Sequence, residues 1–95
     1  MAAYIVADIE ITDPNEYQTY AKQTAATLER YGGKFLVRGG PSETLEGDWK
    51  PKRIVILEFP SVEQAKTWYD SPEYSAIKGI RHRSAISNML LVQGV

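Results

Sequence analysis

Four consecutive apolar residues at positions 54–57 (Ile-Val-Ile-Leu) stand out in the hydrophobic pattern of the chain. A strand with one face in water alternates apolar and polar side chains, whereas a strand that is apolar at every position is covered on both faces. The run at 89–92 (Met-Leu-Leu-Val) has the same character. Both segments are therefore predicted to be strands that need apolar cover on two sides.

The segment between Asp13 and Gly32 is predicted to be a helix. Asp13 can cap the free amides, Pro14 suits the first turn, and Glu16 can complete a capping box. Because the apolar and aromatic side chains recur at helical spacing, they form one stripe that must lie on a sheet. This stripe consists of Tyr17, Tyr20, Ala21, Thr24, Leu28 and Tyr31.

A second helical region is predicted after position 60. Ser61 and Gln64 form another capping box, and Pro72 ends one helix and begins the next. The β-branched and apolar segments predict strands over residues 4–11, 34–38, 53–59 and 87–93. Residues 43–49 are predicted to extend a hairpin arm.

The order strand, helix, strand, strand, helix, strand matches the split βαβ arrangement of ferredoxin-like domains, an α+β fold. We expect one domain over residues 1–95, with a four-stranded antiparallel sheet whose first and third strands are central. Both helical regions then lie on one face of the sheet and leave the other face bare. The sequence therefore predicts a homodimer that pairs sheet to sheet, and a monomer with a less polar second face is the alternative.

Several motifs carry a family resemblance: residues 31–40, 45–47, 56–61 and 68–74, followed by Arg81. Together they resemble the family catalogued as domain of unknown function 1330, over nearly the whole chain. The resemblance implies membership of the dimeric α+β barrel group, in which two ferredoxin-like chains pack sheet against sheet. That group includes cofactor-independent monooxygenases, lactone isomerases, haem enzymes and ligand-sensing modules. It implies the fold and the dimer, but it supplies no catalytic residue to transfer.

Composition narrows the classes of function. The 95 residues carry a net charge of −1, so no global field attracts nucleic acid or an anionic membrane. The absence of cysteine excludes disulfides, thiol nucleophiles and thiolate metal sites. The N-terminus lacks a basic leader and no apolar run reaches membrane-spanning length, so a cytoplasmic protein without a membrane partner is expected.

Glu58 is a candidate general base because it follows the most apolar strand segment. A carboxylate in a dry environment has a raised pKa and can accept a proton near neutral pH. The alternative is that Glu58 lies at a solvated strand end or pairs with an arginine. Antiparallel pairing of the first and third strands would place Tyr4 near Glu58, and Asp8 or Glu10 near Arg53.

Three other polar residues are candidates for the site. Arg38 and Arg81 could hold the anionic group of a substrate through the planar fork of the guanidinium, although Arg38 could equally form an ion pair. His82 could be an acid/base or a single haem ligand, but a basic cluster that caps a helix explains it more simply. We therefore expect no metal site and no cofactor.

Aromatic residues could wall a pocket for a flat apolar ligand. Trp68, Trp49 and Tyr74 are predicted to bind substrate, whereas Tyr17 and Tyr20 fit a helix stripe that belongs to the core.

Two classes of function follow from these candidates. One is a cofactor-independent enzyme, similar to a monooxygenase or an isomerase, acting on a small aromatic or carbonyl compound. The other is a module that binds a small apolar or anionic ligand without turning it over. A structural dimer with a filled core and no ligand is the third alternative.

Overall fold

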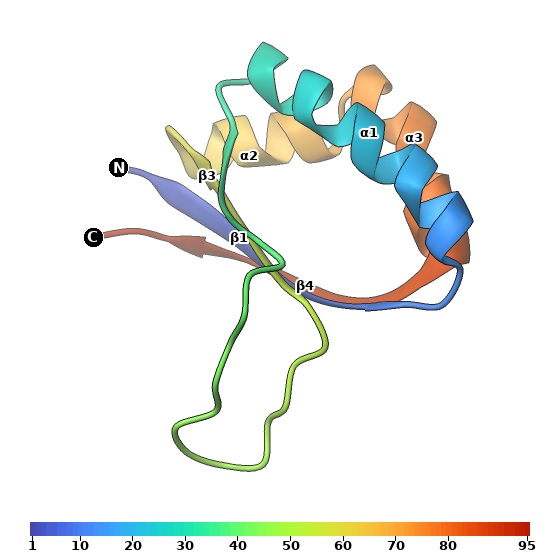
Figure 1. Ribbon diagram of the computed structural model, residues 1–95. Coiled ribbons are helices and arrows are strands. Elements are labelled where there is room, and N and C mark those ends of the chain that lie inside the picture. Colours follow the sequence, from blue (N-terminus) through green and yellow to red (C-terminus); the bar gives the residue numbers. More distant parts are fainter.

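The computed structural model describes residues 1–95 as a four-stranded antiparallel sheet with three helices on one face (Figure 1). The order of strands in the sheet is β2-β3-β1-β4. The predicted ferredoxin-like α+β fold is confirmed. The elements are β1 (Ala3–Ile11), α1 (Pro14–Arg30), β2 (Lys34–Arg38), β3 (Ile54–Phe59), α2 (Val62–Tyr69), α3 (Pro72–Ser84) and β4 (Ala85–Gln93).

The predicted N-cap residues stand at the starts of α1 and α2. The Asp13 carboxylate accepts a hydrogen bond from the Glu16 amide at 3.2 Å, and the Ser61 hydroxyl accepts one from the Gln64 amide at 3.1 Å. The reciprocal half of the first capping box was predicted wrongly. The Asp13 amide donates instead to the Ser84 carbonyl, and the Glu16 carboxylate accepts a hydrogen bond from Arg83 at 2.7 Å. Tertiary contacts thus replace the local pair.

Side chains of β3 alternate between the two faces of the sheet. Val55, Leu57 and Phe59 are buried beneath the helices, whereas Ile54 and Ile56 point to the opposite face and are partly exposed. The continuous apolar run therefore supplies both faces, as its pattern predicted. In the structure of one chain, only the helical face is covered (Figure 1).

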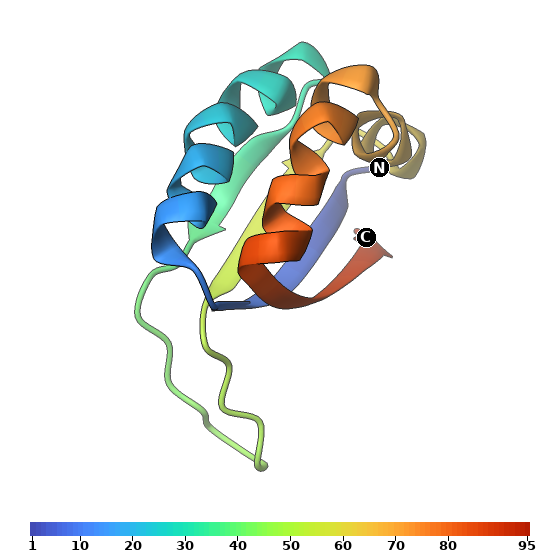
Figure 2. The same cartoon turned by 90° about the vertical axis from the view of Figure 1, so that its right-hand side faces the viewer.

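An aromatic cluster joins the helices to the sheet. The Trp68 ring lies with its centroid 4.0 Å from that of Tyr74 and 5.4 Å from that of Phe59, and all three side chains are fully buried. α1 and α3 run side by side over the sheet (Figure 2). Position 33, which follows α1, requires glycine, because a side chain added there would collide with the Phe59 ring.

Two predicted elements differ from the structure. Residues 43–49 form no strand; they belong to a long loop between β2 and β3 that projects beyond the sheet (Figure 1). The loop is held at its return by Asp8, whose carboxylate accepts hydrogen bonds from Trp49 Nε1 and the Lys52 amide, each at 3.0 Å. β4 begins at Ala85 rather than Ser87, because Ala85 and Ile86 pair with the end of β1. None of the helices is long and apolar enough to cross a membrane.

Candidate ligand-binding site

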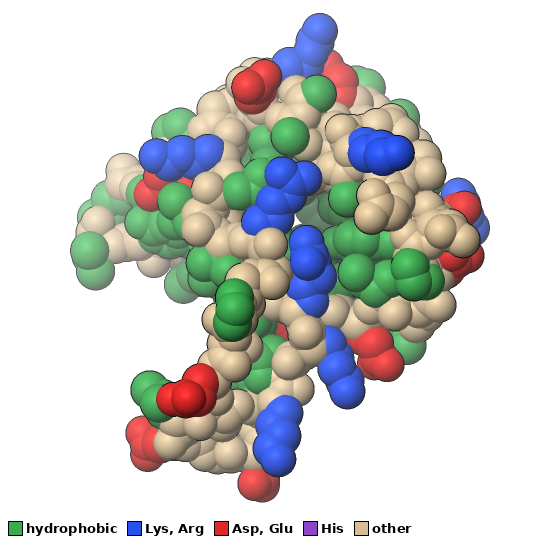
Figure 3. Space-filling model, in the orientation of Figure 1, with side chains coloured by type: hydrophobic (Ala, Val, Ile, Leu, Met, Phe, Trp, Pro, Cys, Tyr) green, Lys and Arg blue, Asp and Glu red, His purple; other side chains and the backbone are tan.

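A cleft opens between α1 and the helical face of the sheet. It is a narrow hollow, visible in Figure 3, with an interior volume of about 30 Å³; the empty space is about 480 Å³ only when the open solvent at its mouth is included. Eleven of its fourteen lining residues are hydrophobic, and the remaining three are Thr24, Arg38 and Arg53. The Thr24 hydroxyl is already engaged, because it donates to the Tyr20 carbonyl at 2.8 Å. The polar character of the cleft is thus set by two arginines and two tyrosine hydroxyls.

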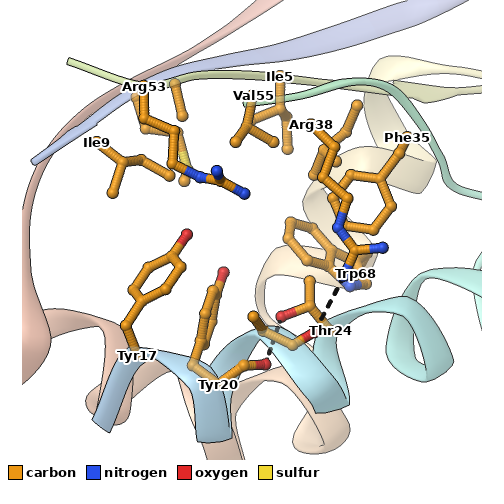
Figure 4. A pocket seen from close by; sticks show the side chains of 14 residues that line it. Ile5, Ile9, Tyr17, Tyr20, Thr24, Phe35, Arg38, Arg53, Val55 and Trp68 are labelled. Atoms are coloured by element: carbon orange, nitrogen blue, oxygen red, sulfur yellow. Dashed lines mark hydrogen bonds between the residues drawn. The ribbon is translucent and has the colours of Figure 1, made fainter. Parts of the chain in front are cut away.

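The two arginines reach the cleft from the chain segments that flank the loop between β2 and β3. In Figure 4 the Arg53 guanidinium points into the cleft, whereas Arg38, an exposed residue, extends beside Phe35 toward α1. Arg38 lies over the Phe35 ring, 4.3 Å from its centroid, and donates to the Ala21 carbonyl at 3.3 Å. Arg53 Nε is buried and has no hydrogen-bond partner. Both groups carry a positive charge at any physiological pH.

No carboxylate neutralises these arginines. The ion pairs of the molecule are Arg30–Glu73, Lys34–Glu58 and Arg83–Glu16, and they use neither Arg38 nor Arg53. The lining of the cleft contains no Asp, Glu or His. The cleft is therefore apolar with an uncompensated positive region.

Tyr17 and Tyr20 face the arginines from α1 (Figure 4). Burial raises the pKa of Tyr17, and the positive charge of Arg53 only partly opposes this shift. Burial, followed by the neighbouring Tyr74, raises the pKa of Tyr20 strongly. Both phenols are consequently neutral near pH 7, so they can donate hydrogen bonds but are poor bases.

Behind the cleft, the Tyr20 hydroxyl takes part in a buried series of hydrogen bonds. Its hydroxyl oxygen lies 2.7 Å from that of Tyr74, and Arg81 Nε donates to the Tyr74 hydroxyl at 3.3 Å. Tyr74 and Arg81 are buried among the helices and do not line the cleft. Their contacts hold the Tyr20 ring in position on the cleft wall.

The predicted aromatic residues divide between the two faces of the sheet. Trp68 lines the cleft at its inner end, where its indole N–H donates to the Thr27 hydroxyl at 3.0 Å. Trp49 lies on the opposite side, hydrogen-bonded to Asp8 and 61% exposed. Of the predicted substrate-binding residues, the structure brings Arg38 and Trp68 to the cleft and separates them from Trp49.

The two predicted acid/base residues lie outside the cleft. Glu58 is on the bare face of the sheet, paired with Tyr4 across the strands, and its carboxylate lies 3.1 Å from Lys34 Nζ. The pairing partner is thus a lysine rather than an arginine. His82 is exposed near the end of α3, where limited desolvation and the charges of Arg81 and Lys78 lower its pKa. No group of three His, Cys, Asp or Glu side chains is placed to hold a metal ion.

Comparison with known proteins identifies the family. The model of the family described as domain of unknown function 1330 (DUF1330) matches residues 2–95. The chain belongs to this family. A search of curated proteins finds no match.

Solved structures show the same fold as this DUF1330 chain. A protein of unknown function from Rhodopseudomonas palustris superposes with a TM-score of 0.79 at 19% identity, covering 99% of this chain and 82% of that one. SnoaB, a cofactor-independent oxygenase from Streptomyces nogalater, gives a TM-score of 0.67 at 14% identity, with coverage of 99% and 93%. A dimeric ferredoxin-like protein of unknown function from Jannaschia sp. gives 0.67 at 11% identity, with coverage of 99% and 100%.

Sequence reasoning missed Arg53 as a cleft residue of this DUF1330 protein. The signal was present, because successive side chains of a strand point to opposite faces of the sheet, so positions 53, 55, 57 and 59 share one face. Arg53 therefore points to the same face as Val55 and Leu57. Tyr17 and Tyr20 were interpreted as core, and they are buried, but their hydroxyls also face the cleft.

Proposed function

We propose that this DUF1330 protein is a homodimer that binds a small, flat, largely apolar molecule in the cleft between α1 and the sheet. One observation carries the proposal: the cleft is lined by aromatic and aliphatic side chains, with only a few polar groups in fixed positions. Small-molecule sites typically have this composition. The two arginines at this apolar cleft, which no carboxylate neutralises, disfavour the alternative of a dimer that binds no ligand.

The lining favours binding over catalysis. A proton-abstracting enzyme needs a base within hydrogen-bond reach of its substrate. The cleft holds no carboxylate or imidazole, and the raised pKa values of Tyr17 and Tyr20 keep both phenols protonated at neutral pH, so neither is available to accept a proton. We therefore assign the cleft to ligand binding.

A cofactor-independent enzyme is the second candidate, because the fold is shared with SnoaB, which is described as a cofactor-independent oxygenase. In this candidate, Glu58 or His82 would be the base and Arg38 or Arg81 would stabilise the anion, which requires a site other than the cleft, because neither base lines it. Turnover of an identified aromatic substrate that is lost in Glu58→Gln or His82→Ala would support it. Turnover that survives both changes would contradict these assignments.

Filling the cleft tests the binding proposal. Ala21 lines the cleft from α1, so the ring of Ala21→Phe would occupy space that a ligand needs. We expect this variant to bind N-phenyl-1-naphthylamine, a neutral fluorescent probe, at least about 10-fold more weakly than the unaltered protein. Fluorescence titration measures the loss.

Ala25→Phe is the matched control, because Ala25 lies on the same helix with its side chain exposed to solvent. It adds the same ring away from the cleft and should leave the affinity unchanged. Equal weakening by both variants, or none by Ala21→Phe, would show that the probe does not bind in the cleft.

The bare face of the sheet supports the homodimer. β4 presents Ile86, Leu90 and Val92 to solvent, with 63%, 57% and 45% of each residue exposed in the single chain. Val6 and Ile56 extend this apolar surface across the two central strands. A two-fold axis would cover both copies at once, because the same patch is presented by each chain. The Jannaschia protein, described as dimeric, has the same fold.

A further inference from the structure

We infer that the cleft selects a flat aromatic or conjugated acid, and that Arg53 and Arg38 bind its carboxylate. The inference rests on the proposed function, since it specifies the ligand class of the same cleft. It goes further by assigning a charge to the ligand and a role to Arg53.

Arg53 has an unpaired donor. Its Nε is buried and has no acceptor within the protein. A buried donor without a partner is unfavourable, so native structures rarely keep one unless a ligand or an ordered water supplies the acceptor. A guanidinium offers donors in a planar fork that matches the two oxygens of a carboxylate.

The positive charge at the cleft is not balanced within the protein. Arg53, which is half-buried, and Arg38, which is exposed, both line one apolar cleft whose lining includes no acidic residue. Two like charges repel each other, and an anion placed between them relieves the repulsion. The three arginines outside the cleft each have a hydrogen-bonded side-chain partner, namely Glu73 for Arg30, Tyr74 for Arg81 and Glu16 for Arg83, whereas Arg53 interacts only with the neutral Tyr17 hydroxyl.

The groups around the arginines also suit an anion. The Tyr17 hydroxyl points toward Arg53 across the cleft (Figure 4), and its raised pKa keeps it protonated and able to donate to an anion. The glycine at position 39 leaves room for the Arg53 side chain. Gly39 has a φ of 74°, and a side chain there would collide with the Arg53 guanidinium.

The walls of the cleft favour a flat ligand. Beyond the arginines the walls are aromatic: Tyr17 and Tyr20 have ring centroids 5.4 Å apart on one side, and Phe35 and Trp68 stand on the others. Flat rings pack well against such faces. An acid with its ring between these walls would carry its carboxylate toward Arg53 and Arg38.

Two probes of nearly equal shape test the charge. The probe 2-naphthoate carries a carboxylate, and 2-naphthamide replaces it with a neutral amide. We expect the unaltered protein to bind 2-naphthoate about 10- to 100-fold more tightly than 2-naphthamide by isothermal titration calorimetry. The preference should shrink as salt is added, because the interaction is between charges.

Arg53→Met tests the residue. It should reduce the affinity for 2-naphthoate by about 10- to 100-fold and leave that for 2-naphthamide within about two-fold. Arg53→Lys keeps the charge but loses the fork, so it should fall between Met and Arg. Arg38→Met should also weaken 2-naphthoate selectively. Arg30→Met, which removes an exposed arginine outside the cleft, is the matched control and should change neither affinity.

The outcomes separate this inference from the proposed function. Equal binding of the two probes to the unaltered protein, or an equal loss of both in Arg53→Met, would overturn the anion inference while leaving cleft binding intact. If neither these probes nor N-phenyl-1-naphthylamine binds, both proposals fail. Circular dichroism of each variant establishes that it is folded, and the salt dependence of the unaltered protein tests the charge without any substitution.

Discussion

Trp68→Ala is expected to lower the free energy of unfolding by about 3–5 kcal/mol, the usual cost of removing a large buried aromatic side chain. Trp68 is fully buried, and its ring packs on Tyr74 and Phe59 with centroid separations of 4.0 and 5.4 Å. The change also removes the donor to the buried Thr27 hydroxyl. Because small domains are stable by only about 5–15 kcal/mol, much of the total would be lost.

Urea denaturation followed by far-ultraviolet circular dichroism measures this loss, with all variants at one protein concentration. Trp49→Ala is the matched control. Trp49 is 61% exposed and makes one hydrogen bond to Asp8, so its removal should cost no more than about 1 kcal/mol. A cost for Trp68→Ala no larger than that for Trp49→Ala would contradict the central place of Trp68 in the core.

Leu90→Lys is expected to raise the dissociation constant of the proposed homodimer by at least about 100-fold. The side chain lies on the bare face of β4, paired with Val6 of β1, and is 57% exposed in one chain. If two such faces pack together, the change places one ammonium group from each chain in an apolar interface. An unpaired buried charge costs several kcal/mol, and each 1.4 kcal/mol corresponds to a factor of ten.

Analytical ultracentrifugation over a range of concentrations measures the dissociation constant. Ala25→Lys, which adds the same charge to the exposed side of α1, should leave it unchanged. Leu90→Lys should retain the circular dichroism spectrum of the unaltered protein, because Leu90 does not belong to the core of one chain. A monomeric unaltered protein at micromolar concentration, or a dimer insensitive to Leu90→Lys, would refute pairing through this face.

The elements of the fold were predictable where local signals and periodicity agree. Asp13 and Ser61 cap helices as expected, and Tyr4 pairs with Glu58 as the antiparallel order requires. The predicted arm at 43–49 was wrong, since its polar and glycine-containing sequence forms a loop tethered to Asp8. β4 starts two residues early because Ala85 and Ile86 find partners on β1, which no local signal reports.

The candidate site was predictable only in part. Arg38 and Trp68 were singled out from the sequence and both line the cleft, whereas Glu58 and Trp49 are on the other side of the sheet. Strand parity could have placed Arg53 on the helical face. No pattern could show that its Nε lacks a partner, because that depends on which side chains from α1 and β2 surround it.

The sequence by itself determined the order of the elements, the two-sided apolar character of β3 and the ferredoxin-like fold, because these follow from short-range periodicity and capping. Only the tertiary structure decided which polar side chains share a cleft. Tyr17, Arg38 and Arg53 lie on different elements, and their chemistry depends on burial and on the absence of a nearby carboxylate. Both conditions arise from packing between segments distant in the chain.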